Sequence, residues 1–255
     1  MTRRVIAAAT QLALPVVVVT TWWWWSTASD SFYFPPLIDI LRTFGDTWLF
    51  EQVGSDVVPS LARLGAGYGL AAVVGVGAGI ALGLSPSAHR VSAPILEFLR
   101  AIPPPALIPP GIVVLGVGNS LKVLVIALAS LWPILLNTTD GVAGVQPVMI
   151  ETARSYGCGP RERLRHVILP AALPQVFAGL RTSLSVAIIV MVVSEMVAST
   201  EGIGFFILRS QRSFAVPEMW SGVLLLGVLG LALNAGLTGI ERRVLRWHPS
   251  QRTSP

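Results

Sequence analysis

Long apolar segments, separated by short polar ones, are the feature that most constrains how this 255-residue chain can fold. A helix needs roughly 20 predominantly apolar residues to cross a lipid bilayer. Six segments approach or exceed that length: 5–25, 57–84, 94–117, 121–136, 174–197 and 217–240. Only 12% of the residues are charged, about half the share that a soluble domain carries. The sequence therefore predicts an all-α membrane protein with six transmembrane helices, and it argues against a soluble enzyme, a disordered chain and a fibrous repeat.

Cysteine and histidine are too sparse to build a metal or redox site. Cys158 is the only cysteine, so no intrachain disulfide can form. His89, His166 and His248 are far apart in the sequence and show no ligand spacing. The net charge of +5 comes from arginines that lie between apolar segments rather than on one amphipathic element. We therefore expect no catalytic residue, no metal and no nucleic-acid partner for this chain.

The basic residues instead indicate orientation, because loops on the cytoplasmic side of a membrane are rich in Arg and Lys. With both chain ends inside, the outer segments hold few basic residues: Arg42, Arg209, Arg212 and, at a border where it can snorkel to the interface, Lys122. The inner segments hold eleven arginines: Arg3, Arg4, Arg90, Arg154, Arg161, Arg163, Arg165, Arg242, Arg243, Arg246 and Arg252. We expect a multi-pass protein of the inner or plasma membrane with both termini in the cytoplasm. A cleaved signal peptide ending near residues 26–28 is the alternative interpretation of the first segment.

Glycines recur in the second apolar segment with repeated four-residue spacing. They are Gly65, Gly69, Gly75, Gly79 and Gly83. Small residues at this spacing let two helices approach closely in lipid. We interpret them as a packing surface without chemistry of its own.

The third apolar segment is interrupted by prolines, which remove helix hydrogen bonds and clash with the preceding turn. They are Pro94, Pro103, Pro104, Pro105, Pro109 and Pro110. Broken backbone at membrane depth is tolerated where protein surrounds it or where it borders a water-filled cavity. Two interpretations stay open: a kink satisfied by neighbouring helices, or a gate or pathway element that includes Pro103 and Pro104.

The longest polar stretch, residues 138–171, is predicted to be a cytoplasmic loop with a helix–turn–helix. A short helix can open at Glu151 and end at Gly157 and Gly159. A second, arginine-rich helix then leads back to the membrane. This shape suits docking into a partner protein. The stretch has no phosphate-binding glycine-rich loop, so we do not expect the chain itself to be an ATPase.

This loop resembles the signature of ABC importer permease subunits, in which Glu-Ala-Ala is followed by three residues, Gly, nine residues, Ile, one residue and Leu-Pro. The matching positions are Glu151, Ala153, Gly157, Leu169 and Pro170. The sequence departs at Thr152 for Ala and at Val167 for Ile, both mild changes in size, and the spacing is intact. Further segments resemble the nitrate, sulfonate and taurine branch of that family: residues 99–104, 194–196, 202–204 and 246–248.

The resemblance implies a single permease domain over residues 1–255, with a type I ABC importer permease fold and a coupling loop at 138–171. In that family the permease is a homodimer, a cytoplasmic ATPase dimer binds ATP and Mg²⁺, and a separate solute-binding protein delivers the substrate from outside. The chain itself then needs no cofactor and catalyses no reaction. The implied substrate is a small organic anion such as a sulfonate or taurine, or nitrate. The residues implied in ATPase coupling are Glu151, Thr152, Ala153, Tyr156, Gly157, Leu169 and Pro170.

The same resemblance implies candidate residues for the translocation pathway, because the fourth and fifth segments border the pathway in this family. On those two segments they are Trp132, Asn137 and Ser183. The residues themselves add Pro103 and Pro104 at the break of the third segment, and Ser194 and Glu195 near the end of the fifth. Taken singly, Trp132, Asn137 and Ser183 are better explained by helix packing than by contact with a substrate. Glu195 is the most informative, because an acid at membrane depth is costly and faces a cavity or a partner. It either borders the pathway at an outer gate, or pairs with Arg209 or Arg212, or is satisfied by backbone groups.

Three other functions remain as alternatives. An ion-driven secondary transporter needs no ATPase but favours intramembrane acids and a repeat between halves, and the sequence offers one such acid, Glu195, and no clear repeat. An intramembrane enzyme needs a nucleophile–base pair or a metal cluster, and no histidine lies inside a predicted span. An ABC permease for a neutral or aromatic solute, such as a thiamine-precursor pyrimidine, differs in substrate alone. A neighbouring ATPase gene and binding-protein gene distinguish the importer from the first two.

Overall fold

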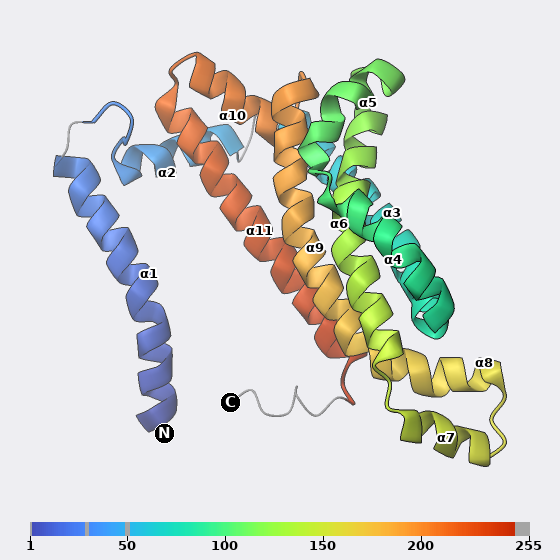
Figure 1. The fold of residues 1–255 in the computed structure, drawn as a ribbon. Helices are drawn as coiled ribbons and strands as arrows, with labels where there is room; N and C mark the ends of the chain where they lie inside the picture. The colour runs from blue at the N-terminus through green and yellow to red at the C-terminus, as the bar shows by residue number, and fades with distance from the viewer. Residues whose placement is uncertain (1, 29–30, 49–51, 248–255) are drawn as a thin grey trace.

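The chain is helical wherever the computed structural model describes regular structure, within residues 2–28, 31–48 and 52–247 (Figure 1). In chain order the helical elements are α1 (Thr2–Ala28), α2 (Leu37–Asp46), η2 (Val53–Val57), α3 (Val58–Leu84), α4 (Pro86–Ala101), η3 (Pro104–Leu107), α5 (Ile108–Leu115), α6 (Asn119–Ala143), α7 (Pro147–Ser155), α8 (Pro160–Arg163), η4 (Leu164–Ile168), α9 (Leu169–Ala198), α10 (Ile203–Arg212) and α11 (Val216–Val244). The prediction of an all-α protein is confirmed. His248 and Arg252, which served the family resemblance and the orientation, lie outside the described residues.

Four helical stretches in the described part of the chain are long and apolar enough to cross a membrane. They are Val53–Leu84, Asn119–Ala143, Pro160–Ala198 and Val216–Val244. The pair Pro86–Ala101 and Pro104–Leu115 makes a fifth if taken together, with a bend of 81° between its halves. α1 is helical through the whole first predicted segment. The structure supports a multi-pass helical membrane protein.

The connection predicted at 138–171 is shorter in the structure, because both flanking helices extend into it. α6 continues to Ala143, and α9 already begins at Leu169. Pro170 is the second residue of α9, which directly follows the π-helical turn η4 (Leu164–Ile168). Pro174, predicted to begin the fifth span, lies inside the helix.

α3 and α6 pack closely because one face of α3 carries almost no side chains. That face is formed by small residues at every fourth position: Gly67, Ala71, Gly75, Gly79 and Gly83. A Cβ atom placed on Gly79 would lie 2.6 Å from Thr138 Cβ, and one on Gly83 would lie 2.6 Å from Val142 Cβ. Such spacing of small residues allows close backbone approach without bulky side chains between the helices.

The prediction of a small-residue packing face on this helix is therefore confirmed for Gly75, Gly79 and Gly83 but wrong for Gly65 and Gly69. A Cβ atom on Gly65 or Gly69 would have no neighbour within 4 Å, so these two glycines do not contact α6. Gly67 and Ala71 take their place. The predicted set jumped six positions between Gly69 and Gly75, and a helix face cannot be continuous across that jump because it repeats every three or four residues.

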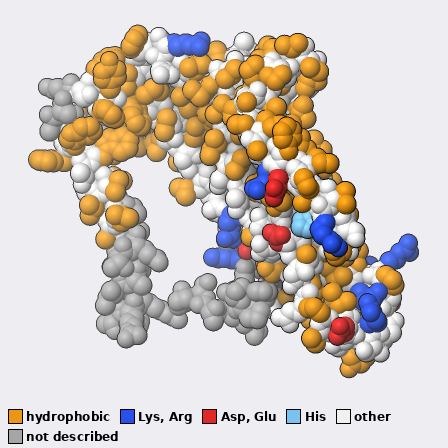
Figure 2. Space-filling model, viewed as in Figure 1, with side chains coloured by type: hydrophobic (Ala, Val, Ile, Leu, Met, Phe, Trp, Pro, Cys, Tyr) orange, Lys and Arg blue, Asp and Glu red, His pale blue; other side chains and the backbone are white. Residues whose placement is uncertain are grey.

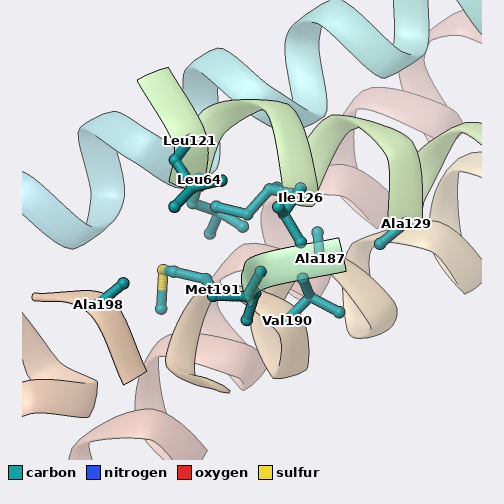
Figure 3. Close-up of a cluster of buried hydrophobic side chains, with 10 residues drawn as sticks. Leu64, Leu121, Ile126, Ala129, Ala187, Val190, Met191 and Ala198 are labelled. Atoms are coloured by element: carbon teal, nitrogen blue, oxygen red, sulfur yellow. The ribbon is translucent and has the colours of Figure 1, made fainter. Parts of the chain in front are cut away.

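The main apolar core lies where α3, α5, α6 and α9 meet (Figure 3). Ile126 and Ala187 are completely buried in it, and Met191 is 1% exposed. The buried members are Leu64, Ile108, Leu121, Val125, Ile126, Ala129, Ala187, Val190, Met191 and Ala198. This core places the start of α3 and of α6 against the end of α9.

α2, α10 and the start of α11 close one end of the molecule, and α7 and α8 lie at the opposite end (Figure 1). Trp48 fills the contact at the first end. Its ring lies 4.6 Å from that of Phe206, and its Nε1 donates a hydrogen bond to Ser221 Oγ at 3.1 Å. The C-terminal part of α1 joins this end through Trp22, whose ring lies 5.4 Å from that of Trp220.

Substitution of Gly79 by valine tests the close contact between α3 and α6. Gly79→Val should lower the free energy of unfolding by about 1–3 kcal/mol, the usual cost of overpacking, because the new side chain collides with Thr138. Gly77→Val on the same helix is the matched control, since a Cβ there meets nothing within 4 Å. Thermal unfolding of the two purified variants in one detergent gives the comparison. Equal melting temperatures would contradict the packing described here.

Candidate functional site

The turn between α7 and α8 is closed by a specific hydrogen-bond pattern. Cys158 N donates to Ala153 O at 3.0 Å, and Gly157 N donates to Arg154 O, also at 3.0 Å. These two bonds form a Schellman motif, which requires a left-handed residue just after the helix. Gly157 supplies it with φ of +80°. The glycine at this signature position is therefore needed by the backbone of the turn.

Glu151 was expected to begin the first helix of the loop, but it does not begin α7. The helix begins four residues earlier at Pro147, whose fixed φ suits a first helical position. Glu151 lies in the second turn, where its side chain is exposed and its backbone carbonyl accepts a hydrogen bond from Ser155 Oγ. The prediction that the helix opens at Glu151 is therefore wrong.

The structure groups most of the predicted coupling residues on one projecting surface. Glu151, Thr152, Tyr156 and Gly157 are exposed there, and the Tyr156 side chain is 84% exposed. Ala153 is buried on the inner side of α7.

Leu169 and Pro170, the last two predicted coupling residues, are separate from this surface. They are half-buried at the start of α9. The neighbouring apolar cluster of Val142, Val145, Ile168 and Ala172 attaches the turn to the ends of the long helices.

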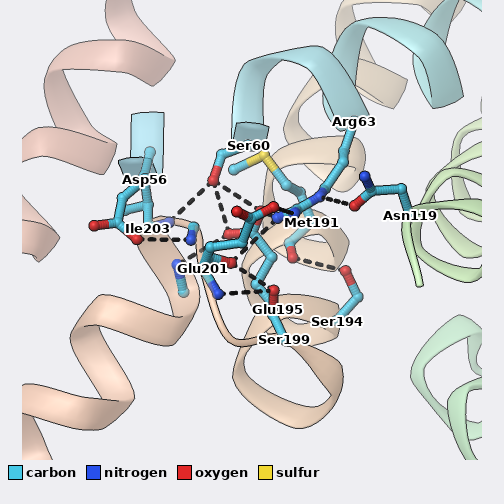
Figure 4. A network of polar contacts seen from close by, with 12 residues as sticks. Asp56, Ser60, Arg63, Asn119, Met191, Ser194, Glu195, Ser199, Glu201 and Ile203 are labelled. Atoms are coloured by element: carbon cyan, nitrogen blue, oxygen red, sulfur yellow. Dashed lines mark hydrogen bonds and ion pairs between the residues drawn. The ribbon is translucent and has the colours of Figure 1, made fainter. Parts of the chain in front are cut away.

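At the opposite end of the molecule, a buried ion pair joins α3 to α9 (Figure 4). Arg63 Nη1 lies 2.8 Å from Glu195 Oε1, and the two side chains are 3% and 0% exposed. Ser60 Oγ lies 2.8 Å and 2.9 Å from the two carboxylate oxygens. Gly204 N donates to Glu195 Oε2 at 3.0 Å. The carboxylate is thus fully surrounded by donors, as a buried charge must be.

The remaining donors of Arg63 bind two further elements. Its Nε donates to Asn119 Oδ1 at 2.7 Å at the start of α6. Its Nη1 donates to Glu201 O at 3.2 Å, and its Nη2 pairs with the Glu201 carboxylate in the turn between α9 and α10. Arg63 therefore ties together α3, α6, α9 and that turn.

Backbone groups of the same turn complete the network. Gly202 N donates to Asp56 Oδ1 at 2.7 Å, and Ile203 N donates to Ser60 Oγ at 3.0 Å. Gly202 has φ of +112°, and a Cβ on it would lie 2.5 Å from the carboxylate carbon of Glu195. The turn can approach the ion pair this closely only with glycine at that position.

The expected pairing of Glu195 with Arg209 or Arg212 is wrong. Its partner is Arg63, which lies within an apolar segment and was not among the predicted site residues. The available signal was a serine and an arginine at positions 60 and 63, one helical turn apart near the start of that segment. Arg209 instead lies over the rings of Phe205 and Phe206, 5.7 Å and 5.5 Å from their centres.

In this conformation the side chains of the predicted pathway residues on α6 and α9 pack between helices and make hydrogen bonds to them. Ser183 and Ser194 are buried, and each hydroxyl donates to a carbonyl of its own helix. Asn137 Nδ2 donates to Pro133 O at 2.8 Å, and its Oδ1 accepts from Gln175 Nε2 at 3.0 Å. Trp132 is half-buried. Their role in a pathway stays a prediction.

The broken third span lies beside these helices. α4 ends at Ala101, and η3 begins at Pro104 after exposed Pro103. Ala106 N donates to Pro103 O at 2.9 Å, which satisfies one donor at the break. Lys122, expected to snorkel to the interface, is only 4% exposed near the start of α6.

No group of three His, Cys, Asp or Glu side chains that could hold a metal ion occurs within residues 2–28, 31–48 and 52–247.

Comparisons with known proteins agree on one family. Residues 71–246, which include α7 and α8, match the family described as binding-protein-dependent transport system inner membrane component. The taurine transport system permease protein of Escherichia coli K12 is 34% identical over 80% of this chain and 73% of its own length. The bicarbonate transport system permease protein of Synechocystis is 34% identical over 78% and 70%. A putative aliphatic sulfonates transport permease protein of Bacillus subtilis is 31% identical over 85% and 78%.

The fold has a solved counterpart in the inward-facing MetNI methionine ABC transporter. The similarity has a TM-score of 0.64 at 21% identity, and it covers 74% of this chain and 94% of that one. At this identity the likeness supports the fold alone. The family resemblance inferred from the α7–α8 signature is confirmed.

Loss of one partner from the buried ion pair should destabilise the protein strongly. Arg63→Met leaves the Glu195 charge buried without its partner, which costs about 3–5 kcal/mol, whereas removing both charges in Arg63→Met with Glu195→Leu costs less. The control is Arg181→Met, which breaks an ion pair with Glu241. The Arg181 side chain is 47% exposed, and such pairs contribute about 0–1 kcal/mol. Thermal or denaturant unfolding in detergent measures all three. If Arg63→Met and Arg181→Met unfold at the same temperature or denaturant concentration, the network does not stabilise the protein.

Proposed function

The chain belongs to the family of binding-protein-dependent transport system inner membrane components, and from this premise we propose that it forms the translocation pathway of an ATP-driven importer. It is an ABC importer permease of the branch that includes taurine and sulfonate permeases. Such subunits are non-catalytic. The ATP and Mg²⁺ of the cycle bind to a partner ATPase.

The observation that carries this proposal is the projecting α7–α8 turn, which lies inside the family match and has the signature glycine at φ of +80°. We assign the exposed face of Glu151, Thr152, Tyr156 and Gly157 to contact with the ATPase. Ala153, Leu169 and Pro170 attach this face to the long helices. Closure of the two ATPase subunits on ATP then moves the turn.

Helical continuity offers a route for that movement. α8, η4 and α9 form one stretch from Pro160 to Ala198, which begins at the turn and ends three residues past Glu195. A shift of the turn is therefore transmitted along α9 to the ion pair at the opposite end. The spans rock from inward-open to outward-open, and hydrolysis resets them.

We assign the whole chain, residues 1–255, to one permease domain with six spans, made of α1, α3, the bent α4–α5 pair, α6, α9 and α11. Both termini and the α7–α8 turn face the cytoplasm, in agreement with the distribution of arginines. Two copies form the pathway, and a solute-binding protein docks from outside.

The proposed pathway follows the interface of the broken span with α6 and α9. It includes Pro103, Pro104, Trp132 and Asn137. Ser183, Ser194 and Glu195 join it only when the packing around them opens, because all three are buried in this structure.

We propose a small anion as substrate, a sulfonate such as taurine or a nitrate-like or bicarbonate-like ion. The support is the set of relatives, which are permeases for taurine, bicarbonate and aliphatic sulfonates by name. A neutral or aromatic solute is the competing substrate class.

Gly157→Val should uncouple the chain from its ATPase. Valine disfavours positive φ, and a left-handed conformation costs a residue with a side chain about 1–2 kcal/mol, or roughly a 5- to 30-fold loss of docking affinity if the turn must regain its shape to dock. Gly159→Val is the matched control, because Gly159 has φ of −66° and only an ordinary contact near its Cβ position. Co-purification of the ATPase with each variant, followed by ATPase assay in lipid, gives the result. Equal recovery of the ATPase with both variants would contradict the coupling proposal.

Substrate-loaded binding protein should stimulate ATP hydrolysis by the assembled transporter in lipid. Taurine, an alkanesulfonate, nitrate and bicarbonate are compared with a neutral pyrimidine, each with the cognate binding protein. We expect stimulation by one of the anions. Stimulation by the pyrimidine alone would rule out an anion importer while leaving the ATPase coupling intact.

A further inference from the structure

A basic cavity lies between the α7–α8 turn and the ends of α3 and α6. Its volume is about 470 Å³, within the range of small-molecule sites. Its basic lining consists of Arg154, Arg161 and Arg163. None of the residues that the proposed ATPase surface exposes, Glu151, Thr152, Tyr156 and Gly157, lines it. The cavity is therefore a feature apart from the proposed docking face.

The walls of this cavity are apolar and come from the ends of two membrane-spanning helices. Leu84 is the last residue of α3, and Val142 and Ala143 are the last two of α6. Ile150, Leu164 and Ile168 complete the apolar part of the lining. Since the spans end here, the cavity lies at the level where hydrocarbon gives way to lipid headgroups.

The charge of the cavity is uncompensated within the described residues. No acidic side chain lines it, and none of the three arginines is within ion-pair distance of a described carboxylate. The nearby Glu162 instead accepts a hydrogen bond from Gly159 N at 2.8 Å. Figure 2 shows Lys or Arg side chains at this end of the molecule, with an Asp or Glu side chain beside them. Three guanidinium groups around one cavity favour an anion with several oxygen acceptors.

We propose that this cavity binds the headgroup of an anionic phospholipid from the cytoplasmic leaflet. Arginine guanidinium groups bind phosphate oxygens in a bidentate manner, and basic pockets between membrane helices on the cytoplasmic side suit anionic headgroups. The phosphate lies on Arg154, Arg161 and Arg163, and the first acyl carbons lie along Leu84 and Val142. The apolar wall distinguishes this ligand from free phosphate, which has no group to place there. The bound lipid joins the turn to α3 and α6.

The test titrates the purified full-length chain in a neutral detergent with short-chain phosphatidylglycerol and records thermal unfolding. Phosphatidylglycerol should raise the melting temperature, and short-chain phosphatidylcholine and inorganic phosphate at equal concentration should raise it far less. Arg161→Gln with Arg163→Gln should weaken phosphatidylglycerol binding at least tenfold, from about fivefold for each basic residue near a membrane surface. Arg165→Gln with Arg242→Gln is the control, since these two arginines are exposed and lie outside the cavity lining.

A second variant separates the cavity from general surface charge. Ala143→Trp fills the space without changing any charge, and it should weaken phosphatidylglycerol binding as the double arginine variant does. Equal binding by the two double arginine variants, or equal protection by inorganic phosphate, would overturn the proposal. So would a double variant at 161 and 163 that loses the ATPase in co-purification while it still binds phosphatidylglycerol, because the cavity would then hold a protein segment. If Ala143→Trp does not fold, the arginine variants still test the proposal, because they change only side chains near the surface.

Discussion

The ion pair between Arg63 and Glu195 organises one whole end of this protein. Charges buried this deeply are stable only when every polar atom finds a partner, and here Ser60, Asn119 and the backbone of Gly204 supply them. The same requirement orders the turn between α9 and α10, because that turn provides part of the shell. Helices that are far apart in sequence are thereby held in one arrangement by electrostatics between two buried charges.

A different interaction, the close contact between α3 and α6, holds the bundle together along its length. The small residues of α3 let its backbone approach α6, so that these two helices meet through dispersion and backbone contact rather than through large side chains. Because lipid is as apolar as a leucine side chain, close fit rather than hydrophobicity drives such association. α3, α6 and α9 form a unit in this way, whereas α4 has no buried side chain at all. Within this chain α4 is thus less restrained by packing than α3, α6 and α9, whereas α5 joins the main core through Ile108.

Helix α9 connects the α7–α8 turn with the buried ion pair at the opposite end of the molecule. Its first residue follows α8 and η4, and Glu195 lies near its last residue. If the chain couples to an ATPase as proposed, a stiff element must carry the movement from the turn to the far side of the membrane. The continuous helix from Pro160 to Ala198 has that geometry, and the proposed rocking of the spans would act on the ion pair at its far end.

Local features of the chain were readable from the sequence alone. The apolar segments predicted helices because a backbone in lipid must satisfy its own hydrogen bonds, the prolines after Ala101 predicted the break, and Gly157 predicted the turn that its positive φ now explains. What only the tertiary structure decided is which side chains meet. Arg63 and Glu195 are 132 positions apart, and no periodicity connects them. The contact face of α3, with Gly67 in place of Gly65, likewise depends on the rotation of the helix against α6. Helix formation is governed by neighbours in the chain, whereas pairing depends on how the helices pack.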